Sequence, residues 1–409
     1  MIDTIKKKIL LISSGQPSLN PRLVKEADSL CDSGYEVTVL YAYWNTWGTL
    51  FDKQLIAAKK WRAILVAGDP DDNRFTYFLS KVIFRIAQKI NNAFTGKILM
   101  DVAIARPAFF LKREAKRHIV DIYIAHNLGA LPAAVTAAKT HGKPCGFDAE
   151  DFHRNEVSDD VNNTDVILKA NIEDRYLPQL NYFTTSSPQI ADAYFKLYPD
   201  LKPAVLLNVF PTYAIKQKVD TKGSLKLFWF SQTIGANRGI ESIAAALSLL
   251  NKPDFELHLL GNLSPNDQDF INKIKNSGIT VTLYEPIPPN DIIAFAGQFD
   301  IGLALENQVP YNRDICLTNK IFTYMQAGLA IVASDTLAQR TFIADNPTIG
   351  KVYPNGDEHA LADILSSFQQ DRTHLTKCKN EALHLAQTQY NWETESLKFL
   401  TVVKQTLDN

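Results

Sequence analysis

Strand-like segments alternate with helical segments along almost the whole chain, and this alternation limits the possible folds more than any other feature. Short, continuously apolar runs rich in β-branched residues occur at 7–13, 35–43, 63–68, 121–126, 144–148 and 182–187. Such runs are typical of parallel strands that are covered by helices on both faces. A helical pattern follows the first run, with Asn20 as a plausible N-cap, Pro21 at the first position and Gly34 at the end. The first half therefore predicts a doubly wound α/β domain.

The same pattern begins again in the second half of the chain. Strands are expected at 225–231, 255–261, 279–284, 300–306 and 330–335. The chain has 409 residues, which is too long for one ordinary core, so two domains are expected. The stretch 204–224 ends in polar, strand-poor sequence and reads as a linker. We place the domains at 1–208 and 209–388, followed by an amphipathic helix over 389–409.

Composition excludes several classes of function. The net charge of −1 argues against general nucleic-acid binding. The four Cys residues are far apart and lack metal-ligand spacing, which predicts buried thiols, a reducing compartment and no metal site. No apolar run approaches the roughly 18 residues of a membrane span, so a cytoplasmic protein is expected. Open parallel sheets bind ligands beyond the carboxyl ends of their strands, and two facing sheets could hold a substrate between them.

Polar residues follow three strands of the first half. Gly15 lies in a loop that either contacts a sugar or phosphate or is a plain turn with a helix cap. His126 ends a buried strand, where it is either a structural residue or a ligand contact at the sheet edge. Asp148 begins an acidic stretch that either takes a proton from an acceptor hydroxyl or is a solvated loop. That stretch also contains Glu150, Asp151 and Glu156.

Two helix starts in the second half favour binding of an anion. One follows the strand 225–231 and carries Gly235, Arg238 and Gly239. The other is TNKIFTYMQAGLAIVASD (318–335), in which Asn319 and Lys320 stand at the beginning of a helix. Helix starts present free backbone N–H groups and partial positive charge, and glycines allow the backbone to approach a ligand. Because both belong to one domain, we expect them to converge on a diphosphate.

These segments resemble the GT-B fold glycosyltransferases, most closely glycosyltransferase family 4, a large retaining family with many bacterial surface-polysaccharide enzymes. The resemblance covers nearly the whole chain and is carried by IAHNLGALPAA (124–134), GFDAEDFH (146–153), FSQTIGANRGIESIAAAL (230–247), HLLG (258–261) and NKIFTYMQAGLAIVASD (319–335). It implies two Rossmann-like domains facing across a cleft, with the last helix packed back on the first domain. It also implies a nucleotide-sugar donor held by the second domain, a glycan or lipid-linked glycan acceptor held by the first, and retention of configuration without metal or cofactor.

The resemblance assigns roles to individual residues. Arg238 matches one of two basic residues that grip the diphosphate, and Lys320 is expected to replace its missing partner. His126 matches a histidine that contacts the transferred sugar. The family's ribose-binding Glu falls at Thr323, which shifts ribose recognition toward Glu306 or Asp314. The predicted catalytic residues are thus His126, Glu306 and Asp148, and the predicted donor-binding residues are Gly15, Arg238, Asp314, Asn319, Lys320 and Thr323.

Two rival functions and one partner remain open at this level. The chain could be another GT-B enzyme such as a nucleotide-sugar 2-epimerase, or a non-catalytic nucleotide-sugar-binding protein, since Thr323 departs from the family pattern. Segment 78–118 carries nine Lys or Arg against two acidic residues, with five interleaved Phe. It predicts peripheral contact with an anionic membrane, at the inner face, unless these are ordinary solvated helix faces over a core.

Overall fold

The computed structural model describes residues 6–94, 96–215, 223–236, 238–250, 254–264, 267–276 and 278–408. Contacts divide the chain into two compact units. The first unit comprises residues 1–207 and 396–409, and the second comprises residues 208–395. Part of the expected linker, residues 216–222, lies outside the described residues.

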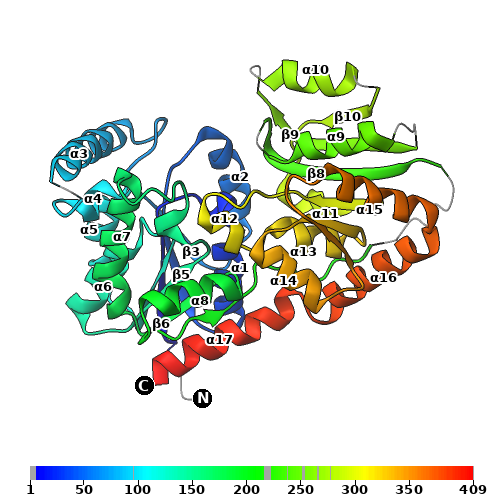
Figure 1. Cartoon of the computed structure of the whole chain (residues 1–409). Coiled ribbons are helices and arrows are strands. Elements are labelled where there is room, and N and C mark those ends of the chain that lie inside the picture. Colours follow the sequence, from blue (N-terminus) through cyan, green and yellow to red (C-terminus); the bar gives the residue numbers. More distant parts are fainter. Residues whose placement is uncertain are drawn as a thin grey trace. The chain divides into compact units, whose positions relative to one another are not determined.

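The first unit contains a seven-stranded parallel sheet in the order β3-β2-β1-β4-β5-β6-β7 (Figure 1). Its strands are β1 (Lys8–Ser13), β2 (Glu36–Ala42), β3 (Arg62–Val66), β4 (Ile122–His126), β5 (Cys145–Ala149), β6 (Tyr182–Thr185) and β7 (Ala204–Val205). Its helices are α1 (Pro21–Asp32), α2 (Thr46–Ala57), α3 (Arg74–Ala93), α4 (Met100–Ala103), α5 (Ala108–Ala115), α6 (Leu131–His141), α7 (Thr164–Tyr176) and α8 (Pro188–Leu197).

Helices cover both faces of this sheet. The four residues 9–12 of β1 are all 0 % exposed, although successive side chains of a strand point to opposite faces. On one face, Ile9 and Leu11 pack in a cluster with Leu23 of α1 and with Phe399 and Val403 of α17 (Trp392–Asp408). The last helix therefore contributes to the core of the first unit, as the sequence resemblance implies.

The second unit contains a six-stranded parallel sheet in the order β10-β9-β8-β11-β12-β13. Its strands are β8 (Leu225–Ile234), β9 (Phe255–Leu263), β10 (Thr280–Tyr284), β11 (Ile301–Ala304), β12 (Ala330–Ser334) and β13 (Gly350–Tyr353). Its helices are α9 (Ile240–Leu250), α10 (Gln268–Asn276), α11 (Ile292–Ala296), α12 (Tyr311–Ile315), α13 (Asn319–Gln326), α14 (Leu337–Asp345), α15 (Glu358–Gln370) and α16 (Arg372–Thr388).

The structure differs from the sequence expectations at three strands. β7 has two residues and β13 has four, including a Lys, so neither forms the apolar run that marks the other strands. β8 continues to Ile234, three residues beyond the expected end, after a register irregularity between Phe230 and Thr233. The turn before α9 is therefore shorter than expected and begins at Gly235.

Both sheets reverse their strand order at one point. In the first sheet the reversal lies between β1 and β4, where Ser13 is aligned with His126. In the second it lies between β8 and β11. Open α/β sheets bind ligands beyond the carboxyl ends of the strands at this switch point. Among the described residues, no helix combines the length and apolar character needed to cross a bilayer.

Candidate functional site

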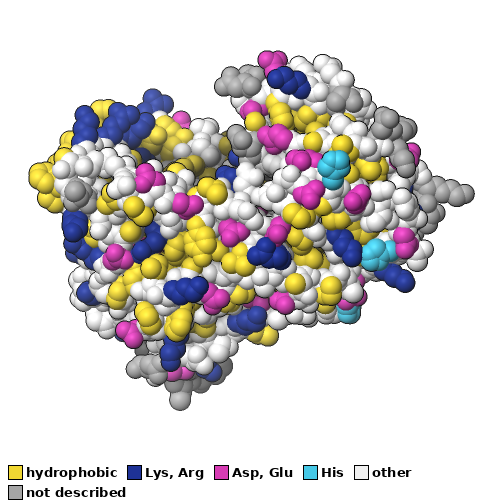
Figure 2. All heavy atoms as spheres, in the orientation of Figure 1, with side chains coloured by type: hydrophobic (Ala, Val, Ile, Leu, Met, Phe, Trp, Pro, Cys, Tyr) yellow, Lys and Arg dark blue, Asp and Glu magenta, His cyan; other side chains and the backbone are white. Residues whose placement is uncertain are grey.

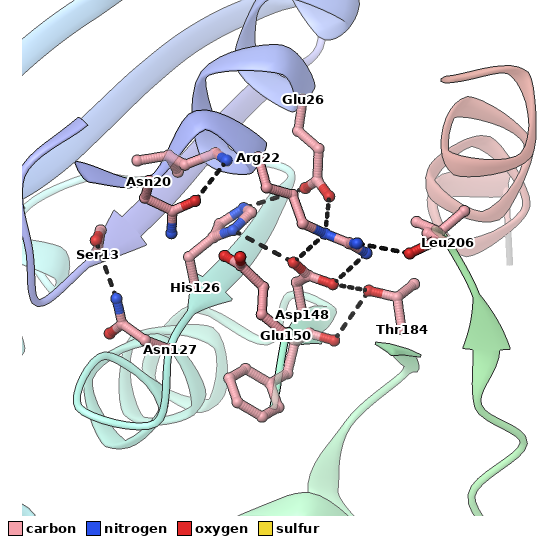
Figure 3. A network of polar contacts seen from close by, with 12 residues as sticks. Ser13, Asn20, Arg22, Glu26, His126, Asn127, Asp148, Glu150, Thr184 and Leu206 are labelled. Atoms are coloured by element: carbon pink, nitrogen blue, oxygen red, sulfur yellow. Dashed lines mark hydrogen bonds and ion pairs between the residues drawn. The ribbon is translucent and has the colours of Figure 1, made fainter. Parts of the chain in front are cut away.

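In the first unit, a buried network of charged side chains lies at the carboxyl end of the sheet (Figure 3). Arg22 and Glu26 come from α1, one helical turn apart, and His126 and Asp148 come from β4 and β5. All four residues are at most 1 % exposed. Charged residues are almost never buried to this degree unless they are paired.

Arg22 joins three parts of this network. Its Nη2 donates to Asp148 Oδ1 at 2.7 Å, and its Nε lies 2.6 Å from Asp148 Oδ2. Its Nη1 donates to the carbonyl oxygen of Leu206 at 2.6 Å, and Glu26 Oε1 lies 3.5 Å from Nε. Asp148 also accepts a hydrogen bond from Thr184 Oγ1 at 2.7 Å. The planar guanidinium thus fixes the Asp148 carboxylate at two oxygens.

His126 lies between the two buried carboxylates. Its Nε2 is 3.1 Å from Glu26 Oε2, and its Nδ1 is 3.7 Å from Asp148 Oδ2. Neither contact has the direction of a good hydrogen bond, so the attraction is mainly between charges. Burial alone lowers the pKa of His126, but the Glu26 carboxylate, and then Asp148, raise that pKa above its ordinary value. The two carboxylates therefore favour the charged form of the imidazole.

With the imidazole charged, the four buried groups balance one another, two cations against two anions. Glu150, at the end of β5, adds a third carboxylate and is only partly buried. Burial and then the Asp148 charge raise the pKa of Glu150 to about 7. Burial and then the Arg22 charge lower the pKa of Lys25 to about 7. Near neutral pH, Glu150 can thus both accept and donate a proton.

This geometry changes the interpretation of two predicted catalytic residues. His126 and Asp148 are predicted to reach a ligand directly, but both are buried and held by charged partners. Ligand atoms of His126, Asp148 and Glu150 lie within 4.8 Å of one another, a spacing that a metal ion could bridge. The Arg22 guanidinium already balances the Asp148 carboxylate that such an ion would bind. The contributions of Arg22 and Glu26 are missing from the sequence predictions, although their i, i+4 spacing on an otherwise apolar helix face is a readable signal.

The turns after β1 and β4 are joined at the same edge. The side-chain oxygen of Asn127 accepts hydrogen bonds from Ser14 Oγ at 2.6 Å and from Ser14 N at 3.2 Å. Asn127 has a positive φ of 61°, which Asn tolerates better than most residues. At Gly15, an added Cβ would meet one atom, Ser13 Oγ, at 3.9 Å. The space beside Gly15 is therefore open, as a ligand-contacting turn requires.

In the second unit, Arg238 lies in the turn between β8 and α9 and is exposed. Its Nη1 donates to Ser231 Oγ at 2.9 Å. The next residue, Gly239, has a φ of +80°, and an added Cβ would lie 2.6 Å from Leu305 Cβ. Because Leu305 directly follows β11, this close approach places the Arg238 turn beside the carboxyl end of that strand.

Lys320 and Glu306 form an ion pair at the same end of the sheet. Glu306 follows β11, Lys320 lies in the first turn of α13, and their charged atoms are 2.5 Å apart. Ser334, the last residue of β12, fixes the Glu306 backbone: its Oγ accepts from Glu306 N at 2.8 Å and donates to Glu306 O at 2.7 Å. The structure thus brings Arg238, Glu306 and Lys320 to one region of the second unit.

The remaining predicted donor residues have specific local roles. Thr323 is 2 % exposed, and its hydroxyl donates to Asn319 O within the same helix at 3.1 Å. Asp314 accepts at Oδ1 from Leu337 N at 2.8 Å and thereby caps the first turn of α14. Asn319 is exposed at the beginning of α13. Of these three residues, Asn319 is the exposed one, so it is accessible to a ligand.

Comparison with known proteins gives structural matches alone. No protein family matches the sequence, and no curated protein matches it. Sucrose-phosphate synthase from Thermosynechococcus elongatus matches with a TM-score of 0.68 and 13% identity, over 98% of this chain and 99% of that one. HepE of Anabaena, in complex with UDP-glucose, matches with a TM-score of 0.67 and 13% identity, over 98% and 100%. A variant of S. aureus TarM, in complex with Fondaparinux, α-GlcNAc-glycerol and UDP, matches with 0.66 and 10%, over 97% and 99%.

These matches extend over nearly the whole of each chain and pair both units with their counterparts. At such low identity they establish the fold and do not transfer an activity. The strand orders of the two sheets agree with this conclusion. The protein has the two-sheet α/β architecture of the GT-B glycosyltransferases, as the sequence resemblance predicts.

Proposed function

We propose that the protein is a glycosyltransferase that moves a sugar from a nucleotide-diphosphate sugar to an acceptor hydroxyl. The observation that carries this proposal is the region formed by Arg238, Gly239, Glu306 and Lys320 at the switch point of the second sheet. The shared fold supports it, because solved structures with this fold include complexes with UDP and UDP-glucose.

A diphosphate suits this region for electrostatic reasons. Arg238 offers an exposed guanidinium whose one described partner is a neutral hydroxyl. The backbone at Gly239 can lie close to a ligand, and the partial positive charge at the start of α13 favours an anion. Thr318 Oγ1 already caps this helix by accepting from Lys320 N. Lys320 is held in place by its ion pair with Glu306, so the positive charge of Lys320 would be shared between that carboxylate and a bound phosphate. The cationic groups are therefore positioned before the ligand arrives.

The proposed mechanism depends on stabilising charge at the leaving diphosphate. Negative charge grows on the diphosphate as the bond to the sugar breaks, and Arg238 and Lys320 stabilise it. Preorganised donors of this kind contribute about 3–4 kcal/mol each in well-studied enzymes. Retention follows from the family resemblance. Thr323 lacks a carboxylate for the ribose, so the diphosphate rather than the ribose dominates donor recognition in this proposal.

In the first unit, the buried charges position the groups that meet the acceptor. Arg22 and Glu26 fix Asp148 and His126, and Glu150 is the partly exposed carboxylate next to them. We assign Glu150 the contact with the acceptor hydroxyl and give Asp148 a positioning role. Glu306 is assigned to holding Lys320, where it can also contact a sugar hydroxyl.

The test is nucleotide binding and sugar transfer by Arg238→Ala and Lys320→Ala. Lys351→Ala is a matched control, because Lys351 is an exposed cation on β13 of the same unit. Titration calorimetry with UDP, GDP, ADP and dTDP gives the affinities. Each site variant should weaken the best ligand at least about tenfold, or 1.4 kcal/mol, and the control should not. Unchanged affinity in both site variants would refute the diphosphate assignment.

Two rival functions give different results in the same assays. A nucleotide-sugar 2-epimerase would isomerise the donor in the absence of any acceptor. A non-catalytic binding protein, which the buried Thr323 favours, would bind the donor without slow hydrolysis. Product analysis of the donor after long incubation therefore separates all three functions.

We further propose that α3 contacts the inner face of an anionic membrane, where a lipid-linked acceptor would lie. Phe75, Phe78, Leu79 and Ile86 share one side of this helix at helical spacing and are 77, 65, 37 and 53 % exposed. Figure 2 shows Lys and Arg side chains gathered with hydrophobic ones over α3, at the upper left. Such a helix can lie in the headgroup region with its apolar side down.

The structure also shows that two basic residues of the segment 78–118 are used within the protein and are not available to a membrane. Arg106 is used internally, donating to Ala67 O, Ser80 Oγ and Tyr43 O, and Lys112 pairs with Asp101. Flotation with phosphatidylglycerol vesicles at low salt tests the contact. Phe75→Ser with Phe78→Ser should abolish co-flotation, and Ile119→Ser, at an apolar site that is 71 % exposed, should not. Absence of co-flotation by the unaltered protein would refute it.

A further inference from the structure

Two of the five Trp side chains are exposed, and both lie in one short stretch of the first unit. Trp44 is 71 % exposed and Trp47 is 42 % exposed, whereas Trp61, Trp229 and Trp392 are at most 7 % exposed. An exposed indole leaves a large apolar face in water. Exposed aromatic residues that cluster at a ligand-binding edge therefore point to a binding surface.

These residues lie at the carboxyl end of the sheet. Trp44 follows β2, and Trp47 lies in the first turn of α2. The neighbouring strand is β1, and Ala42 N donates to Gly15 O at 3.2 Å, which joins the turns after β1 and β2. The Trp pair therefore stands at the same sheet edge as the buried charged network.

The backbone beneath the Trp pair is held rigidly by one buried side chain. Gln16, which is 2 % exposed, accepts at Oε1 from the backbone N of Trp44 at 3.0 Å and of Asn45 at 2.8 Å. Its amide nitrogen donates to Asp52 Oδ2 at 2.9 Å. At Gly48, an added Cβ would lie 2.7 Å from Gln16 Oε1, so a larger residue there would displace the Gln16 amide. The loop is thus fixed while its indoles remain exposed.

The surrounding charge is nearly balanced. The stretches 43–52 and 67–73 contain four Asp, while Lys53 and Arg74 border them and Arg106 donates to Tyr43 O and Ala67 O. This near balance gives no attraction to an anionic lipid surface, in contrast to α3. Carboxylates and amides can instead accept and donate hydrogen bonds to the hydroxyl groups of a neutral ligand.

We propose that Trp44 and Trp47 form a stacking surface for a sugar ring of the acceptor, which makes the acceptor an uncharged glycan. The C–H faces of a pyranose ring pack against an indole, while its hydroxyls reach the polar groups around the loop. A rigid aromatic surface loses little conformational entropy on binding, so a ligand that makes few contacts can still bind. This inference rests on the proposed transferase function and specifies the chemistry of its acceptor.

The experiment uses the full chain and intrinsic fluorescence. Maltotriose, cellotriose and N-acetylchitotriose are titrated to about 50 mM, so that binding with a dissociation constant of about 1 mM would reach saturation. At least one should give a saturable change and reduce acrylamide quenching, because the two exposed Trp dominate quenching. Trp44→Leu and Trp47→Leu should each raise the dissociation constant for the sugar at least about fivefold. Phe195→Leu, at an exposed aromatic residue of α8, should leave that constant unchanged.

Two outcomes would overturn the inference. One is no saturable change with any of the three sugars. The other is a change with phosphatidylglycerol vesicles alone, which would assign the Trp pair to a bilayer. Thermal shifts with UDP, GDP, ADP and dTDP on the same preparation separate the two proposals. A shift with any of these nucleotides but no sugar response refutes the stacking surface alone, and the absence of both refutes the transferase function as well.

Discussion

Replacement of Arg22 by Met should strongly destabilise the first unit. Arg22 is 0 % exposed and makes the hydrogen bonds and ion pairs that balance Asp148 and Glu26. Met fills a similar volume but carries no charge. It leaves one buried cation, His126, against two buried carboxylates. Removing one partner of a buried ion pair typically costs about 3–5 kcal/mol, because the other charge stays desolvated.

Hydrogen exchange measured by mass spectrometry shows which unit of the Arg22→Met variant loses stability. Peptides from β1 and β4 report on the first unit, and peptides from β8 and β11 are an internal control. At about 1.4 kcal/mol per factor of ten, exchange in β1 and β4 should accelerate by about two to four orders of magnitude. Exchange in β8 and β11 should change little, because these strands belong to the second unit.

A double variant tests whether charge balance is the cause. Asp148→Asn keeps an oxygen that can accept from Thr184 but removes the negative charge. In the Arg22→Met/Asp148→Asn protein, His126 and Glu26 balance each other again. The double variant should therefore be more stable than Arg22→Met alone. Additive losses, or a single variant that costs less than about 1 kcal/mol, would refute the argument.

Three further predictions address single groups. The pKa of folded Glu150 is raised from 4.5 to about 7, so the folded state binds this proton more tightly and stability decreases as pH rises through that window. Glu150→Gln should remove about 3 kcal/mol of this pH dependence in urea titrations. Gly239→Ala should weaken nucleotide binding and lower the stability by about 1–3 kcal/mol, because the added Cβ collides with Leu305. Gly278→Ala is the control: at φ +86° with open space around it, it should lower the stability by about 1 kcal/mol and leave nucleotide binding unchanged. Asp314→Ala should cost about 1 kcal/mol of stability through the lost cap of α14 and change nucleotide affinity less than about twofold; a tenfold loss of affinity would instead support its predicted ribose contact.

The fold follows closely from the sequence because buried parallel strands are legible as apolar runs. All eleven strands expected from such runs are present, and β7 and β13 are missed because they are too short to form one. Site residues are harder to interpret from the sequence. The sequence places His126 and Asp148 at strand ends correctly, but burial depends on α1, which is more than 90 residues away in the chain from either. A pattern of local residues does not show that Arg22 and Glu26 cover them.

The two units handle charge differently at equivalent places in their sheets. At the first switch point, Arg22 and His126 are buried and matched by Glu26 and Asp148, so neither of these two cations is left for an anionic ligand. At the second, Arg238 is exposed and its described bond is to a neutral serine hydroxyl. Because a diphosphate binds where cationic charge is uncompensated, we propose that the second unit holds the donor and that the first holds a neutral substrate. The same fold can therefore hold two different substrates through the placement of a few charges.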